Sequence, residues 1–222
     1  MLRTAVSVTA AAIAATCALA ACGPVQMGSA AILGNERITS TMLSDQVANL
    51  QQWYQAHKSK IQLQFPLSQA PQEVLAWMVR FRVRDEMAAR NHVKVSSGQS
   101  ARALDAIAAQ AGPSGIKNLA VANGLPPDLL PNLGRYEAIQ NALVNKMDGG
   151  TLPKSTAAQQ ALGAALAVRQ CRAAKAMDIL VNPRFGQLDY SQLSIIPAAT
   201  ALSAPVTPSP SPSTRPALKP PC

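Results

Sequence analysis

The first regular pattern of large and polar side chains lies between residues 39 and 60. Large side chains recur there at intervals of four, three, four and three residues, at Leu43, Val47, Leu50, Tyr54 and His57. This spacing is that of one stripe along an α-helix, and it predicts that the stripe faces a core. Thr39 or Ser40, both of residue types that cap helix N-termini, is expected to begin a helix that runs to about Lys60.

Five further segments carry helical patterns, each bounded by residues that start or stop helices. A second helix is expected from about Pro71, since proline suits a first turn, to about Asn91. Residues 96–99 have the spacing of a capping box and predict the start of a third helix, which stops at Gly112-Pro113. The other three are expected over about 114–123, 126–148 and 155–179. The inner side of the last one is predicted to be Leu162, Leu166, Ala173, Met177 and Leu180.

Extended chain is expected at both ends of this helical region. Gly34-Asn35 separates two short apolar arms, which is a hairpin signal, and residues 181–186 are predicted to pair with these N-terminal strands. The predicted fold class is therefore mainly α: a multi-helix domain over residues 30–196, with a small β-sheet formed by its N- and C-terminal segments. Residues 197–222 are rich in proline, alanine, serine and threonine, so we expect a disordered tail.

The N-terminal residues have the parts of an export signal. Arg3 precedes an apolar run, and small residues follow just before Cys22. Residues 19–22, Leu-Ala-Ala-Cys, resemble the lipobox of bacterial lipoproteins, in which the cysteine is diacylated and becomes the first mature residue. This interpretation predicts a signal peptide over residues 1–21, a lipid on Cys22, a linker over 22–29 and a location on the extracytoplasmic face of the cell membrane. A plain signal peptide and an uncleaved anchor helix are the alternatives.

Charge and cysteine content fit an exported protein. The chain has 20 Lys and Arg against 11 Asp and Glu, an excess that suits anionic lipid or cell-wall polymer as a partner beside the membrane. Because this charge is spread thinly along the chain, a solvated surface that keeps the protein soluble is the alternative interpretation. Nucleic acid is not an expected partner, because export removes it and no basic aromatic motif appears. Loop-closure entropy opposes a disulfide between Cys171 and Cys222, so none is expected. His57 and His92 lie far apart and no CxxC motif is present, so we expect no metal and no cofactor.

Two segments, in this order, resemble a known family of exported chaperones. Residues 32–39, Ile-Leu-Gly-Asn-Glu-Arg-Ile-Thr, resemble the start of SurA-type periplasmic chaperones and PrsA lipoprotein foldases, in which a hairpin leads into a long amphipathic helix. Residues 181–186, Val-Asn-Pro-Arg-Phe-Gly, resemble the segment after the last helix of SurA N-terminal-like lipoproteins. The resemblance implies a SurA-like chaperone module that holds unfolded or partly folded exported polypeptides in a groove between helices.

The resemblance does not extend to the parvulin domain that gives SurA and PrsA their prolyl isomerase activity. Such a domain needs the length of a small independent unit, whereas only residues 149–154 separate the fifth and sixth predicted helices. The carboxylates are scattered and no serine lies in a nucleophile motif, so no catalytic residue is predicted. We therefore expect a non-catalytic chaperone, a holdase. A structural or adaptor lipoprotein of the cell envelope and a degenerate peptidyl-prolyl isomerase are the alternatives.

Large aromatic and methionine side chains are concentrated in the first two helices, although aromatics are only 4% of the chain. Such side chains adapt to varied apolar partners, as client binding requires. Burial in the core is the competing interpretation for each of them. Trp53 and Trp77 fall off the inner stripes and are the best candidates for an exposed groove. The basic run from Arg80 to Arg84 is expected to be a solvated helix face rather than a site for acidic polymer or lipid. The candidate client-binding residues are Trp53, Trp77, Met78, Phe81, Met87 and Tyr136.

Overall fold

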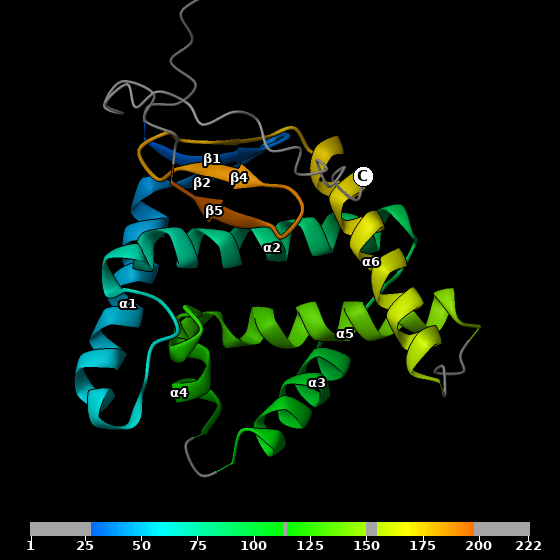
Figure 1. Ribbon diagram of the computed structural model, residues 1–222, viewed down its shortest axis with the longest axis horizontal. Helices are drawn as coiled ribbons and strands as arrows, with labels where there is room; N and C mark the ends of the chain where they lie inside the picture. The colour runs from blue at the N-terminus through cyan, green and yellow to red at the C-terminus, as the bar shows by residue number, and fades with distance from the viewer. Residues whose placement is uncertain (1–27, 113–114, 150–154, 198–222) are drawn as a thin grey trace, which may run out of the picture.

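The computed structural model describes residues 28–112, 115–149 and 155–197 (Figure 1). The predicted signal peptide, Cys22 and the tail from residue 198 onward lie outside these residues. Helices dominate the described part of the chain, so the mainly α fold class is confirmed. They are α1 (Ser40–His57), α2 (Ala70–Arg90), α3 (Ser97–Gln110), α4 (Gly115–Ala122), α5 (Leu130–Met147) and α6 (Thr156–Ala176), with a 3-10 turn, η5 (Pro127–Leu129), just before α5.

Three of the helices, α1, α3 and α6, begin at a capping residue that the sequence supplies. At the start of α1, the Thr39 hydroxyl accepts a hydrogen bond from the Met42 amide at 3.0 Å. Ser96 and Gln99 form the predicted capping box of α3, in which the Gln99 amide donates to the Ser96 hydroxyl at 3.2 Å. Each cap satisfies amides that the helix itself leaves without partners, so these starts follow from the local sequence.

The chain brings its two ends together in a three-stranded antiparallel sheet, in the order β2-β1-β3. The central strand is β1 (Ser29–Leu33), and β2 (Glu36–Thr39) follows it through the predicted turn. The third strand, β3 (Ile179–Val181), comes directly after α6 and pairs with β1. The predicted sheet of N- and C-terminal segments is therefore confirmed, but the pairing strand is Ile179–Val181, so of the predicted segment 181–186 only Val181 belongs to it and residues 183–185 form a turn.

A second sheet is an antiparallel pair that the sequence does not predict: β4 (Gln187–Asp189) and β5 (Ser194–Ile196). Strands of three residues are too short to show the alternation that identifies a strand. The Asp189 carboxylate accepts hydrogen bonds from the Ser191 amide at 2.8 Å and the Ser191 hydroxyl at 2.6 Å. The hydrogen bonds from Ser191 hold the pKa of Asp189 below its usual value. This turn chemistry fixes the hairpin, and β5 packs against α2.

α2 lies in the middle of the molecule (Figure 1). The sheets lie on one side of it, α5 runs along its other side, and α3 packs against the far side of α5. The main core is formed by the sheet, α1, α2, α5 and α6, with Leu33, Leu50, Leu75 and Ile139 among its fully buried members. A smaller group, here called the second cluster, lies between α2, α4 and α5 and has as its buried members Phe81, Ala120, Leu125 and Leu130.

α6 differs from its predicted packing in two respects. Its buried residues are the small ones, Cys171, Ala173 and Ala174, whereas Leu180 belongs to β3 and is 47% exposed, so its predicted place on the inner stripe is wrong. Cys171 is disulfide-bonded, which corrects the prediction that no disulfide forms there. The entropy of closing a flexible loop grows only slowly with its length, so a long loop does not prevent such a bond. The other cysteines all lie outside the described residues.

Candidate functional site

The candidate client-binding residues do not form one surface. Trp77, Phe81 and Tyr136 come together as an aromatic cluster, with ring centroids 5.7 Å apart for Trp77 and Phe81 and 6.0 Å apart for Phe81 and Tyr136. Such distances are typical of favourable tilted and edge-to-face contacts. Met87 is only 1% exposed and belongs to the main core, so in this structure it does not face a client. The aromatic cluster is instead the wall between two surface pockets.

The first of these pockets opens between α1, α2 and the start of α5, and we call it the methionine pocket. It has a volume of about 290 Å³. Met42 of α1 remains 42% exposed here, although it is a large apolar side chain. The candidate residues Met78 and Phe81 both line this pocket. Its lining is Ile38, Met42, Asp45, Gln46, Met78, Phe81, Arg82, Leu129 and Asn132.

The second pocket lies on the other side of the aromatic cluster, between α2, α3, α4 and α5, and we call it the leucine pocket. It has a volume of about 270 Å³. Leu119 of α4 is 47% exposed within it. The Trp77 indole N–H donates to the Asn123 carbonyl at 2.9 Å, which fixes the ring in the pocket wall. The lining includes Trp77, Ile107, Ile116, Leu119, Leu125 and Leu133.

A third pocket, of about 390 Å³, lies where the end of α1 meets the start of α4, and we call it the basic pocket. Trp53 is held in its wall by contacts on both its edge and its faces. The Trp53 indole N–H donates to the Asn118 side-chain oxygen at 2.9 Å, and the His57 ring stacks on Trp53 at 4.2 Å. Lys117 places its ammonium 4.8 Å from the centre of the same ring. The lining is Trp53, His57, Lys60, Gly115, Ile116, Lys117 and Asn118.

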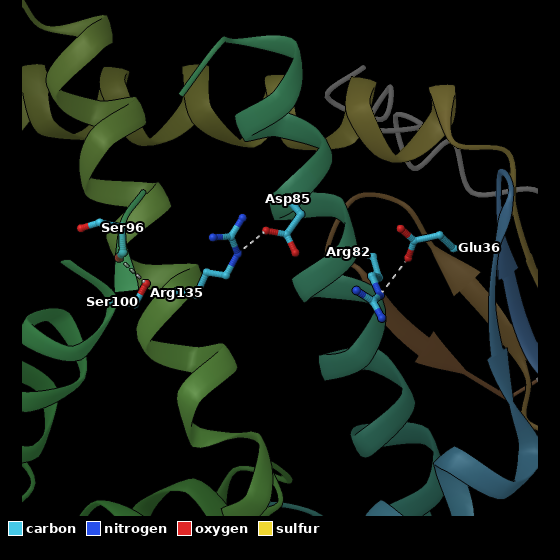
Figure 2. A network of polar contacts seen from close by, with 6 residues as sticks. All are labelled: Glu36, Arg82, Asp85, Ser96, Ser100 and Arg135. Carbon is cyan, nitrogen blue, oxygen red and sulfur yellow. Dashed lines mark hydrogen bonds and ion pairs between the residues drawn. The ribbon is translucent and has the colours of Figure 1, made fainter. Parts of the chain in front are cut away.

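Two ion pairs join α2 to its neighbours (Figure 2). Arg82 of α2 pairs with Glu36 of β2 at 3.0 Å, and Asp85 of α2 pairs with Arg135 of α5 at 2.8 Å. All four side chains are substantially exposed, so each pair contributes at most about 1 kcal/mol. Arg82 also lines the methionine pocket, so the pair with Glu36 orients a side chain of that pocket's wall.

The basic run of α2 is not the uniformly solvated face that the sequence predicts. Arg82 is exposed, but Arg84 is only 3% exposed because it points between α5 and α6. Arg80 is half-buried, with its guanidinium 5.0 Å from the centre of the Trp77 ring. Burial lowers the pKa of Arg80, although Glu73 and Tyr136 partly offset this effect. The three arginines differ in exposure because positions 80, 82 and 84 point in different directions around the helix, and α2 contacts other elements on several of its sides.

Sequence patterns miss the two most exposed apolar side chains of the pockets, Met42 and Leu119. Each lies off the buried side of its own helix, where a single apolar residue is common and carries no signal. A neighbouring element makes the position concave: the start of α5 beside Met42, and α3 and α5 beside Leu119. The candidates Trp53, Trp77, Met78 and Phe81 do line pockets, whereas Tyr136 supports the wall behind them.

The fold and these pockets define a class only coarsely: a mainly helical domain with small antiparallel sheets and concave apolar surfaces between its helices. No family model, characterised protein or solved structure matches this chain. Within the described ranges, no group of three or more His, Cys, Asp or Glu side chains is placed to hold a metal ion. No helix of the described residues is long and apolar enough to cross a membrane.

Proposed function

We propose that this protein is a membrane-anchored extracytoplasmic lipoprotein that binds unfolded exported polypeptides without catalysing a reaction on them. The observation that carries the proposal is the exposure of Met42 and Leu119, at 42% and 47%, each on the wall of a pocket that also presents other large apolar side chains. When a second apolar group covers such a side chain, the buried apolar surface favours binding by about 25 cal/mol per Å². The pockets are therefore suited to apolar side chains of another chain.

The size of the pockets favours side chains of a polypeptide over a single large ligand. Volumes of about 290 Å³ and 270 Å³ lie just below the range, about 300–1,000 Å³, that ligand sites occupy. Each pocket accommodates one or two side chains, and the aromatic cluster of Trp77, Phe81 and Tyr136 separates the two. An extended client segment can thus place side chains in both. The flexible thioethers of Met42 and Met78 allow one pocket to fit different clients.

The export signal and the resemblance to SurA-type modules support the same proposal from the sequence. A lipid on Cys22 would hold the domain beside the membrane from which exported chains emerge. The adaptor alternative uses the same pockets for one fixed partner, and it predicts selectivity for that partner. The holdase proposal predicts binding to unrelated unfolded chains.

Aggregation of several unrelated denatured proteins, measured by light scattering, tests the proposal. We use the mature lipidated chain in phosphatidylcholine nanodiscs and compare Met42→Ser and Leu119→Ser with two matched controls. Leu180 and Ile196 are as exposed, at 47% and 39%, but line none of the three pockets. Each pocket variant should need about threefold to tenfold more protein for the same suppression, since a buried leucine contributes about 1.5–3 kcal/mol and this one is half covered already.

The control variants Leu180→Ser and Ile196→Ser should suppress aggregation as well as the unmodified protein. If the unmodified protein leaves every aggregating substrate unchanged, the proposal is wrong. Equal losses in the pocket and control variants would show that general surface hydrophobicity, rather than the pockets, binds the clients.

A further inference from the structure

The leucine pocket and the basic pocket are neighbours. Ile116, in the first turn of α4, lines both of them, so the two open on either side of one side chain. The leucine pocket offers mainly aliphatic and aromatic walls. The basic pocket offers Lys60, Lys117 and His57, and its lining contains no carboxylate. An apolar site and a cationic site therefore meet at the start of α4.

The positive charge of the basic pocket is not balanced by an acidic side chain among the described residues. Lys60 and Lys117 come from different elements, and neither forms an ion pair with an acidic residue of the described chain. Lys117 also lies in the first turn of α4, where the positive end of the helix dipole disfavours a cation. Two ammonium groups that share a pocket under these conditions repel one another, and a carboxylate between them relieves that repulsion.

The wall behind these charges is held in place before any ligand arrives. Asn118 is 8% exposed and accepts the indole hydrogen bond of Trp53, while His57 covers one face of the same ring. The His57 ring is itself bonded to the Trp53 carbonyl, with 2.9 Å between its Nδ1 and that oxygen. Binding to a rigid wall is favoured because its side chains lose little conformational entropy, whereas those of a mobile surface must first become ordered. The basic pocket therefore has the charge and the preorganisation of an anion site.

We propose that the preferred clients carry an acidic residue close in sequence to a large apolar one, so that the apolar side chain enters the leucine pocket while the carboxylate lies in the basic pocket. This inference rests on the proposed client binding and specifies its substrate class. The shared residue Ile116 is the point over which the client backbone passes. Unfolded segments flanked by lysine are disfavoured because they add positive charge to Lys60 and Lys117.

The test uses three fluorescent peptides with one apolar centre, Leu-Phe-Leu, flanked on both sides by Glu, by Gln or by Lys. Fluorescence anisotropy gives each Kd for the mature lipidated chain in phosphatidylcholine nanodiscs, which avoid anionic lipid. The Glu peptide should bind about fivefold more tightly than the Gln peptide, and the Lys peptide should bind most weakly. High salt should bring the three values together, because these charges are exposed.

Two charge variants separate the basic pocket from net charge. In Lys60→Glu/Lys117→Glu the order of the three peptides should reverse, and in the milder Lys60→Gln/Lys117→Gln the peptides should bind alike. Lys94→Glu/Lys175→Glu changes net charge equally at exposed lysines outside the pocket and should keep the original order. Leu119→Ser should weaken all three peptides by a similar factor.

The outcomes distinguish this inference from the proposed function. If all three peptides bind the unmodified protein with the same Kd, the preference for acidic clients is wrong while client binding stands. A reversal of order in the Lys94/Lys175 control would likewise overturn the assignment to the basic pocket. If no peptide binds and aggregation is not suppressed, the proposed function fails together with the inference.

Discussion

Arg84 is the charged side chain most deeply buried in the described residues, at 3% exposure, and it has no carboxylate partner there. Its Nη2 donates to the Tyr136 hydroxyl and, at 3.1 Å, to the Gln170 side-chain oxygen. The guanidinium also lies 4.1 Å from the centre of the Tyr136 ring. Its Nε and Nη1 have no hydrogen-bond partner among the described residues. A buried charge compensated only by neutral groups makes each of those groups important.

The hydroxyl of Tyr136 is therefore expected to stabilise the fold mainly through Arg84. Tyr136→Phe should lower the free energy of unfolding by about 1.5–3 kcal/mol, the usual effect of losing a hydrogen bond from a charged donor. In an Arg84→Met background the same substitution should cost much less, because the charge that required the acceptor is gone. Urea unfolding of the four proteins gives the coupling energy, and equal costs in both backgrounds would contradict this account.

The sequence could not place Arg84 inside the protein. Arg80, Arg82 and Arg84 alternate in the chain, and a basic run on a helix is usually solvated. Only the packing of α5 and α6 against α2 separates the buried arginine from the exposed Arg82. The same limit applies to Met87, which has the adaptable side chain of a client-binding residue but lies in the main core. Residue type indicates chemical ability, whereas burial depends on neighbours that are distant in sequence.

At the scale of the elements, α5 and α3 come into close contact at Gly134. A Cβ atom at this position would lie 2.6 Å from the Ser100 carbonyl oxygen and 2.9 Å from the Leu104 Cβ, both on α3. The glycine therefore allows the two helices to approach to a distance that alanine does not permit. Because α3 supplies Ile107 to the leucine pocket, this contact also sets the position of one wall of that pocket.

Gly134→Ala and Gly163→Ala form a matched pair of helix substitutions. Alanine at Gly134 should destabilise the protein by about 1–3 kcal/mol, since the added methyl overpacks the contact between helices. Gly163 of α6 has no neighbouring atom within 4 Å of the added Cβ, so alanine there should stabilise by about 0.5–1 kcal/mol through helix propensity. Thermal and urea unfolding measure both. Stabilisation by alanine at both positions would show that propensity, not packing, governs Gly134.

Element boundaries were largely predictable because capping is a local interaction. Ser96 and Gln99 satisfy one another within a single helical turn, and Thr39 bonds an amide only three residues away. The β4–β5 hairpin was not predictable, since its short strands are stabilised by packing on α2 and by the Asp189 turn. Local hydrogen bonds can be read from adjacent residues, but stabilisation by a distant helix cannot.

For the whole molecule, the predicted lipid on Cys22 and the disulfide of Cys171 are linked by the chemistry of sulfur. A thioether on Cys22 leaves that sulfur unable to form a disulfide, and Cys17 belongs to the predicted signal peptide. The lipoprotein prediction therefore assigns Cys222 as the partner of the disulfide-bonded Cys171. A lipid on Cys22 thus implies the Cys171–Cys222 disulfide, whereas that disulfide does not require the lipid.

Mass spectrometry of peptides from the membrane-extracted protein, without reduction, tests this assignment. We expect a peptide pair that joins Cys171 to Cys222 and a diacylated N-terminal peptide that begins at Cys22. Cys222→Ser should leave the lipid in place and release a Cys171 thiol, whereas Cys22→Ala should abolish membrane attachment and keep the disulfide. A peptide pair that joins Cys22 to Cys171 would rule out the lipid and, with it, the anchoring part of the proposed function.

The sequence by itself determined most of the helices, several of their caps and the N-terminal hairpin, because side-chain periodicity and capping act between residues a few positions apart. It is also the basis on which an export signal is predicted, since such a signal is read along the chain. Only the tertiary structure decided which large side chains remain open. Met42, Leu119 and Trp53 become pocket walls through helices that are distant in sequence, and Met87 and Arg84 become core for the same reason. Concavity and burial are properties of packed elements, so no single stretch of sequence contains them.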